Sequence, residues 1–401
     1  MGEAVNLVLL CPRLQHLRHL GPIATAAKLS WRVAFFCPTG GPKDDAATHL
    51  GIVEREGGGP AVEVTGATEL VDMLVLAKAD AVIAVGLRMP PWIRQHVMPQ
   101  TRARGIRWVS VGYLAEELLQ VLEDGPALLG EWDVATTASW EALDWCAERL
   151  AVLRSRAAAA EARRRFVAVG YPALDPLARL NRDWCRTKHG IKGRALLFVP
   201  AARPHLMPRW RHAAFRGGLR WLAPALGLPT YWQVCAAVVR YARRHDAQII
   251  IKTRAKNPDP SWLPHMGQVF GDTTYHPSTT LELVKAADGY CGFASAFAVE
   301  ATAARLHQTH VLAWPPKAAE HPLLLDFRER FFLGDGPWER PGVAQALHLY
   351  RRPESLWTWA ENAPWLGERD PAICARALAP VVGEVNGKAS ERLLDAIDRV
   401  S

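Results

Sequence analysis

The sequence lacks any apolar stretch long enough to cross a membrane. A transmembrane helix needs roughly 20 predominantly apolar residues, and the N-terminal apolar run from Val5 to Leu10 is far shorter than that. The same run is also too short for the hydrophobic core of a signal peptide. We therefore expect it to form a buried strand, and we expect the protein to be cytoplasmic.

Paired cysteines are missing as well. The seven cysteines are scattered along the chain, their number is odd, and none of them forms a C-x-x-C pair. This pattern argues against a disulfide framework and against a zinc site, and it favours a reducing compartment. Because no D-x-D motif suits a required divalent metal either, we expect no metal and no cofactor beyond a substrate.

A strongly biased composition is absent too, although the chain carries a surplus of positive charge and 16 tryptophans, many for this length. Of 401 residues, 49% are hydrophobic and 22% are charged, which is typical of a globular protein long enough for two domains. The formal net charge of +8 suits a partner that carries phosphates, such as a nucleotide, a nucleic acid or an anionic membrane. No nucleic-acid recognition module is apparent, so we expect no nucleic-acid partner.

Short apolar runs alternate with helical periods along the chain. Strands are expected at residues 6–10, 32–37, 61–64, 81–85, 107–111 and 133–137, and the pattern restarts with strands at 166–169, 195–199, 248–252, 288–291 and 310–314. Helices in the second half are expected at 231–244, 279–287 and 295–306. Continuous apolar runs separated by helices indicate parallel sheets covered on both faces.

The expected fold class is therefore α/β, with two Rossmann-like domains facing each other across a cleft. Residues 1–160 would form the N-terminal domain, which would bind an acceptor. Residues 166–380 would form a donor-binding domain, and residues 386–401 a closing helix. The basic, alanine-rich segment 155–165 reads as a solvated helix or linker between them. Ligands of open parallel sheets bind beyond the carboxyl ends of the strands, so the cleft is the expected site.

Three segments of the second half carry candidate functional residues. In VGYPALDPL the chain turns at Gly170 and Pro172, and Asp175 is placed to cap the following helix; a plain strand–turn–helix corner explains the segment equally well. In ALLFVPAAR a buried strand ends before Arg203, whose guanidinium could clamp a phosphate, unless it is simply a surface arginine.

The third segment is DGYCGFASAFAVEA, in which a strand of small residues leads into a helix beginning near Ser295. The hydroxyl of Ser295 and the adjoining amides, including that of Ala296, could bind an anion at the start of the helix. The carboxylate of Glu300 could accept both hydroxyls of a ribose. The alternative is that Ser295 only caps its helix and that Glu300 is solvated.

Taken in order, these segments resemble the C-terminal half of GT-B fold enzymes. They are most similar to the CDP-glycerol glycerophosphotransferases and their relatives in capsule and teichoic-acid synthesis. The resemblance runs from about Phe166 to Val400. It rests on G-x-P-x-x-D, then P-x-x-R, then a strand ending at Lys252, then the segment from Asp288 to Glu300. The ending NGKASER resembles the family's closing helix, which packs near the N-terminal domain. UDP-sugar 2-epimerases share much of this pattern.

The resemblance implies a metal-independent enzyme that moves a sugar or glycerol phosphate from a nucleotide-activated donor to a glycan or lipid-linked acceptor in cell-envelope polymer synthesis. Ser295 and Ala296 would hold the donor phosphate, Glu300 the ribose and Arg203 the diphosphate. The cytidine or uridine ring would lie near the turn from Lys252 to Lys256, where Lys252 and Arg254 would help to bind the donor.

Two departures bear on the kind of transfer. The family's K-x-H-P reads Lys252-Thr-Arg254 here, so Arg254 would substitute for the histidine. The family's N-terminal His-Gly pair is absent from the segment Val109-Ser-Val-Gly-Tyr113. Both departures favour sugar transfer over glycerol-phosphate transfer.

An inverting transfer needs a general base for the acceptor hydroxyl. His16 and His19 follow the first strand of the N-terminal domain and are the candidates, although both also read as surface histidines. Glu116 and Glu117, after the strand at 107–111, are the reserve candidates.

Residues 207–228 mix arginine with aromatic residues, as membrane-surface segments do. Arg209, Trp210, Arg211 and Trp221 are the candidate membrane contacts, at the inner face of the cell membrane; a loop folded against its own domain is the alternative.

Two further functions stay open at this point. One is a UDP-sugar 2-epimerase or hydrolase, which would be expected to carry S-G-G-x-x-E where this chain has SAFAVE. The other is a degenerate nucleotide-binding scaffold, which the missing histidines would suit.

Overall fold

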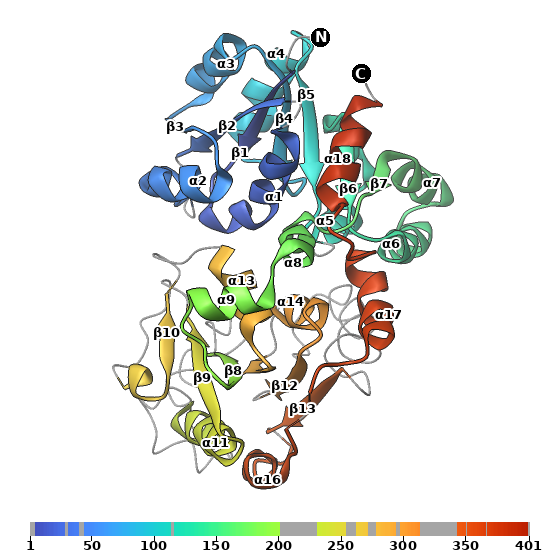
Figure 1. The fold of residues 1–401 in the computed structure, drawn as a ribbon. Helices are drawn as coiled ribbons and strands as arrows, with labels where there is room; N and C mark the ends of the chain where they lie inside the picture. The colour runs from blue at the N-terminus through green and yellow to red at the C-terminus, as the bar shows by residue number, and fades with distance from the viewer. Residues whose placement is uncertain are drawn as a thin grey trace. The chain divides into compact units, whose positions relative to one another are not determined.

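The computed structural model describes residues 5–28, 31–39, 44–113, 116–200, 231–253, 262–271, 278–293, 297–312, 343–349, 351–365 and 367–399. The chain divides into two compact units (Figure 1). The first consists of residues 1–179 together with 379–401, and the second of residues 180–378.

The first unit is built on a seven-stranded sheet in which every pair is parallel, with the order β3-β2-β1-β4-β5-β6-β7. Its strands are β1 (Val5–Leu10), β2 (Trp31–Pro38), β3 (Ala61–Val64), β4 (Ala79–Val85), β5 (Arg107–Val111), β6 (Val134–Thr137) and β7 (Phe166–Ala168). The parallel α/β architecture expected from the apolar runs is confirmed.

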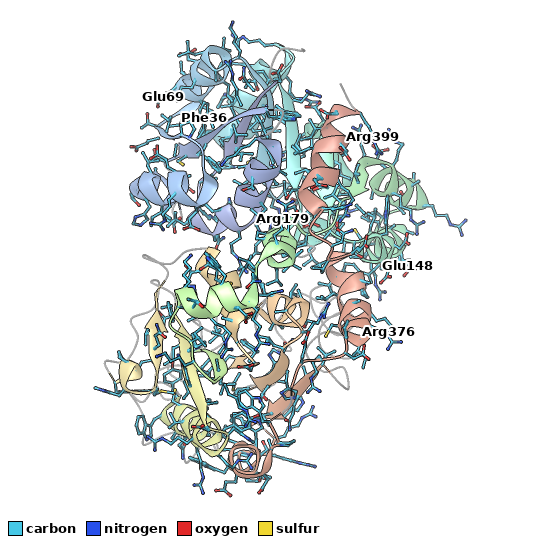
Figure 2. The ribbon with its side chains drawn as sticks, in the orientation of Figure 1. Phe36, Glu69, Glu148, Arg179, Arg376 and Arg399 are labelled. Carbon is cyan, nitrogen blue, oxygen red and sulfur yellow. The ribbon has the colours of Figure 1, made fainter. Side chains whose placement is uncertain are left out.

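The α-helices of the first unit are α1 (Leu17–Ala27), α2 (Leu50–Gly57), α3 (Ala67–Leu76), α4 (Met98–Arg102), α5 (Glu116–Asp124), α6 (Trp140–Leu153), α7 (Arg156–Arg165), α8 (Asp175–Arg179) and α18 (Ala389–Asp398). Shorter turns are η1 (Leu14–His16), η2 (Ala47–His49), η3 (Ile93–Val97), η4 (Pro126–Glu131) and η5 (Pro172–Leu174). Figure 2 shows the side chains that cover these elements.

The boundary between the units differs from the expected one. Of the two interpretations of segment 155–165, the helix is confirmed and the linker is wrong: α7 packs on α6 and buries Ala159 and Ala162, whose small side chains permit a close approach. The strand that follows it, β7, pairs with β6 and is the last strand of the first sheet. The second unit therefore begins at Leu180 and not at Phe166.

The second unit holds a six-stranded parallel sheet with the order β10-β9-β8-β11-β12-β13. Its strands are β8 (Arg194–Val199), β9 (Ala247–Lys252), β10 (Gln268–Phe270), β11 (Gly289–Phe293), β12 (His307–Leu312) and β13 (Ala344–His348). The helices described here are α9 (Arg182–Lys188), α11 (Tyr231–Arg244), α13 (Ser278–Ala286), α14 (Phe297–Ala303), α16 (Ser355–Asn362) and α17 (Pro371–Val382), with the turn η7 (Leu263–His265).

Alternate residues of the central strands feed two hydrophobic layers. In β8, Leu196 and Phe198 pack with α11 and α16, whereas Ala195 and Leu197 pack with α9, α13 and α14. This alternation explains why the strand reads as a continuous apolar run. None of the described helices is both long enough and apolar enough to span a bilayer.

The turn that contains Gly170 and Asp175 anchors the C-terminal helix. The two carboxylate oxygens of Asp175 accept hydrogen bonds from the backbone N–H groups of Ala389 (3.0 Å) and Ser390 (2.7 Å), at the start of α18. Arg392 of α18 in turn donates through Nε to the carbonyl of Val169 at 2.7 Å.

The expectation that Asp175 caps the helix following it in sequence is therefore wrong. Asp175 is the first residue of α8, and its carboxylate caps α18 instead. Gly170 is required here because its φ is +92° and a Cβ atom would lie 2.6 Å from Nη2 of Arg392.

We predict that Asp175→Ala destabilises the first unit by about 1–2 kcal/mol, because the N-terminal amides of α18 lose their cap. Urea unfolding followed by circular dichroism would measure the change. Asp183→Ala removes an exposed acid from the first turn of α9 and should stay within about 0.5 kcal/mol. Equal losses in the two variants would contradict the capping role.

Candidate functional site

Two charged side chains are buried at the carboxyl edge of the second sheet. Lys252 is the last residue of β9 and is 5% exposed, and Glu300 lies on α14, which follows β11, and is 2% exposed. Strand β8 lies between β9 and β11 and pairs with both. Since parallel α/β sheets bind ligands at this edge, buried ionisable groups there mark a candidate site.

Lys252 is held by the backbone at the end of its own strand. Its Nζ donates a hydrogen bond to the carbonyl of Thr253 at 2.9 Å, and the N–H of Thr253 donates to the carbonyl of Phe270 at 2.9 Å. The carboxyl end of β9 is thereby tied to β10, and the ammonium group stays at the edge of the sheet.

Close packing of β11 fixes the helix that carries Glu300. The ring of Tyr290 stacks on Phe297, the first residue of α14, with centroids 5.2 Å apart and planes 19° apart. At Gly292 a Cβ atom would lie 2.4 Å from the hydroxyl of Tyr290 and 3.0 Å from the carbonyl of Val199. The glycine of DGYCGF is therefore a packing requirement.

A chain of buried hydrogen bonds ties α14 to the neighbouring strand β12. Thr302 Oγ1 donates to the carbonyl of Ala298 at 2.7 Å, and Gln308 Nε2 donates to Thr302 Oγ1 at 2.7 Å. Gln308 Oε1 then accepts from Nε2 of His310 at 2.9 Å, which assigns the proton of the imidazole to Nε2. No sequence signal marks these residues, because the polar side chains at 307–309 do not fit the apolar run that predicted the strand from residue 310.

Burial lowers the pKa of His310 to about 3, so the ring is neutral at physiological pH. In the unfolded chain this histidine has its ordinary pKa of 6.5, so it binds a proton as the pH falls below 6.5. In the folded chain the ring stays neutral until the pH approaches 3. The stability that the neutral ring allows is present above pH 6.5 and is lost as the pH falls toward 3.

We predict that His310→Gln, which keeps a hydrogen-bond donor, makes stability less sensitive to acid. Between pH 6.5 and the folded-state value, the free energy of unfolding should lose about 1.4 kcal/mol less per pH unit than in the parent protein. Urea unfolding at a series of pH values would measure this slope. His265→Gln, at an exposed histidine of the same unit, should keep the parent slope; identical slopes in all three proteins would contradict the prediction.

The candidate bases of the first unit lie in different surroundings. His19, on α1, is 0% exposed and packs against the rings of Tyr113 and Tyr171, at centroid distances of 5.0 and 5.1 Å. Its burial, together with the positive charges of Arg18 and His16, places its pKa well below the ordinary value. His16 ends η1 and keeps part of its surface exposed.

Glu117, a reserve candidate, is fully buried and holds the backbone that leaves β5. Its Oε2 accepts from the N–H of Tyr113 at 2.8 Å, and its Oε1 accepts from Thr137 Oγ1 at 2.9 Å. A Cβ atom at Gly112 would lie 2.6 Å from Oε1, so glycine permits this contact. The side chain of Glu116 lies outside the described residues.

Comparison with known proteins relates these two units to solved enzymes. No family model and no curated protein matches the sequence. The wall teichoic acid polymerase TagF matches with a TM-score of 0.57 at 11% identity, over 100% of this chain and 89% of that one. The UDP-GlcNAc 2-epimerase of Methanocaldococcus jannaschii matches with a TM-score of 0.56 at 12% identity, over 98% and 99%. The chain has the GT-B fold.

A third match, S. aureus MnaA solved with UDP, has a TM-score of 0.53 at 10% identity, over 98% of this chain and 96% of that one. A polymerase and epimerases thus share the GT-B fold with this chain. The activity has to be argued from the site residues and not from the fold.

Several residues expected in the site of this GT-B protein lie outside the described part of the chain. They are Arg203, Arg209, Trp210, Arg211, Trp221, Arg254, Ser295 and Ala296. Of the expected donor-binding residues, the structure describes Lys252 and Glu300. Within the described residues, no three His, Cys, Asp or Glu side chains gather closely enough to hold a metal ion.

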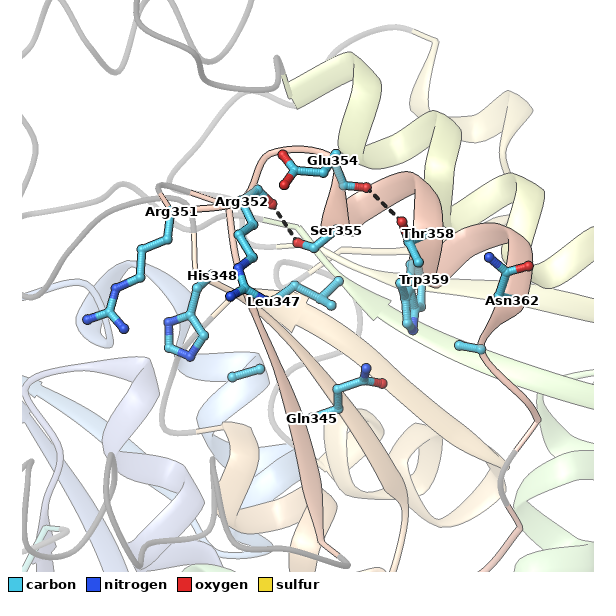
Figure 3. A pocket seen from close by; sticks show the side chains of 12 residues that line it. Gln345, Leu347, His348, Arg351, Arg352, Glu354, Ser355, Thr358, Trp359 and Asn362 are labelled. Carbon is cyan, nitrogen blue, oxygen red and sulfur yellow. Dashed lines mark hydrogen bonds between the residues drawn. The ribbon is translucent and has the colours of Figure 1, made fainter.

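A separate groove of about 680 Å³ runs along β13 and α16 in the second unit (Figure 3). The strand contributes Gln345 and His348, and the helix contributes Ser355, Thr358 and Trp359 to its lining. The hydroxyl of Ser355 donates to the carbonyl of Arg352 at 2.7 Å, and that of Thr358 to the carbonyl of Glu354 at 3.3 Å. No sequence motif singled out these residues.

Proposed function

We propose that the protein is a metal-independent transferase that takes a sugar, or glycerol phosphate, from a nucleotide-activated donor. The observation that carries this proposal is the pair of charged residues at the carboxyl edge of the second sheet, Lys252 and Glu300, which are 5% and 2% exposed. Burying a charge costs free energy, and buried ionisable groups gather at functional sites more often than elsewhere.

The two residues suit different parts of a nucleoside diphosphate. The Glu300 carboxylate is an acceptor and fits the two hydroxyls of a ribose, whereas the Lys252 ammonium fits the charge of a phosphate. Ser295, Ala296, Arg203 and Arg254 would complete the anion contacts. In this scheme positive side chains and backbone amides, rather than a metal ion, stabilise the leaving nucleotide, which is a diphosphate in sugar transfer and a monophosphate in glycerol-phosphate transfer.

The first unit would supply the acceptor side of the reaction. An acceptor hydroxyl would lose its proton to a general base while its oxygen attacks the donor carbon or phosphorus, and the nucleotide would leave. His16 is the proposed base because it retains exposed surface, whereas His19 and Glu117 are buried.

Solved neighbours support a nucleotide ligand. One TagF structure was soaked with CDPG, and the MnaA structure holds UDP. By analogy, the acceptor of the present protein would be a glycan or lipid-linked molecule of the cell envelope, and the protein would act in the cytoplasm, at the inner face of the membrane. A UDP-sugar 2-epimerase is the second candidate, because epimerases match this fold as well as the polymerase does.

We predict that Glu300→Ala weakens the binding of CDP or UDP by about 10- to 100-fold, because hydrogen bonds to a charged group contribute about 1.5–3 kcal/mol. Isothermal titration calorimetry would measure the dissociation constant of each nucleotide. Glu354→Ala, at an exposed glutamate beside the groove of Figure 3, should leave binding unchanged. Loss of binding in the Glu354 variant alone would indicate that the nucleotide binds in that groove. It would contradict the assignment of Glu300 to the ribose.

We also predict that His16→Ala lowers kcat by about 10²- to 10⁴-fold while nucleotide affinity is retained, as expected for loss of a general base. Release of nucleotide from CDP- and UDP-activated donors would be followed with and without candidate acceptors. Release that requires an acceptor supports transfer, whereas an isomerised sugar formed without acceptor supports the epimerase. A His16 variant with the parent's kcat would exclude this residue as the base.

A further inference from the structure

The turn between α6 and α7 exposes two aliphatic side chains next to each other. Val152 is 80% exposed and Leu153 is 53% exposed, at the last two positions of α6. Figure 1 shows the two helices side by side in the first unit, and contacts along their length confirm that they form a hairpin. Two adjacent exposed aliphatic side chains at the tip of a hairpin form an apolar surface, and such surfaces often mark contact with an apolar partner.

Arginines lie beside this pair in the sequence. Between residues 149 and 160 the chain carries Arg149, Arg154 and Arg156, and the nearest acidic residues, Glu148 and Glu161, lie just outside this stretch. Arg154 is partly engaged, because its Nη2 donates to the carbonyl of Glu123 at 2.6 Å, whereas Arg156 is exposed at the start of α7. The tip therefore combines apolar surface with exposed arginines.

The outward face of α7 continues the same mixture. Its exposed residues beyond Arg156 are Ala157, Ala160, Arg163 and Arg164, so alanines lie between arginines. Arg163 and Arg164 pair with Asp144 and Glu161 on the surface, where such pairs are weak and exchange readily for other anions. Small alanine side chains would let a flat surface approach the helix closely.

We propose that the α6–α7 turn docks onto a lipid bilayer that contains anionic headgroups. Val152 and Leu153 would enter the boundary between headgroups and acyl chains, and the arginines beside them would contact lipid phosphates. An acidic protein or a nucleic acid would satisfy the arginines but would leave the aliphatic pair in water. The observation is independent of segment 207–228 and of the proposed activity.

The first unit contains a built-in comparison. Val75 and Leu76, at the end of α3, are 44% and 85% exposed and so present a similar aliphatic pair. That helix, however, carries Glu69, labelled in Figure 2, and Asp72 and no basic residue, whereas arginines flank the α6–α7 pair on both sides in the sequence. If apolar exposure alone were enough for docking, α3 would dock as well as the α6–α7 turn.

The experiment is cosedimentation of the full chain with phosphatidylcholine vesicles, with and without phosphatidylglycerol. The parent protein should bind the vesicles that contain phosphatidylglycerol, and added salt should weaken the binding. Val152→Ser with Leu153→Ser should lower the partition coefficient about tenfold, and Arg156→Ala about fivefold, in line with the contribution of one arginine at an anionic surface.

The matched control is Val75→Ser with Leu76→Ser, which should bind like the parent. All variants change exposed side chains, so melting temperatures equal to the parent's would show that each remains folded. The proposal is overturned if the parent ignores anionic vesicles, or if the α3 variant loses as much binding as the α6–α7 variant. It is also overturned if duplex DNA binds more tightly than the vesicles with the same dependence on Arg156.

Discussion

A charged side chain can be kept away from water only where the protein or a ligand replaces the interactions that water would have made. Lys252 and Glu300 meet this constraint at one edge of the second sheet, and the surrounding structure is arranged around them. The carbonyl of Thr253, just beyond β9, accepts a hydrogen bond from Lys252 Nζ. The ring of Tyr290 and the hydrogen bonds of Thr302 hold α14, the helix that carries Glu300. Buried ionisable groups at this edge of a parallel sheet mark a candidate site, because ligands of such sheets bind there.

Several residues of the family-like motifs prove to be structural. Asp175 caps α18, and Gly170 and Gly292 make room for close contacts. Asp288 precedes β11, at the amino edge of the sheet, where it accepts from Arg186 at 3.2 Å and from the N–H of Ala195 at 2.8 Å. Capping, positive φ and tight packing constrain residue type as strongly as chemistry does. A motif shared with an enzyme family is therefore a mixture of framework and site.

The sequence predicts the two parallel sheets well, since strands buried on both faces read as apolar runs. The sequence predicts the structure less well where contacts between distant residues decide the outcome. The basic, alanine-rich segment at 155–165 resembles a linker, yet α7 buries Ala159 and Ala162 against α6, and β7 follows it into the first sheet. The hydrogen bonds of Gln308 and His310 could not be predicted from the sequence, because Thr302 and Gln308 become their partners only when α14 packs beside β12. Of the candidate site, the positions of Lys252 and Glu300 at a strand end and a helix start were predictable; the burial of His19 between two tyrosines was not.

Transfer and epimerisation differ in the acid and base groups that each reaction needs. In the first unit, the carboxylate of Glu117 accepts hydrogen bonds from the N–H of Tyr113 and the hydroxyl of Thr137. His19 is buried against the rings of Tyr113 and Tyr171. An enzyme that removes and returns a proton on the sugar itself needs acid and base groups with access to the ring. A transferase needs less from this side, because the acceptor brings the nucleophile and one base such as His16 is enough. Under the proposed transfer, His16 would be this base and the acceptor hydroxyl would be the group that it deprotonates.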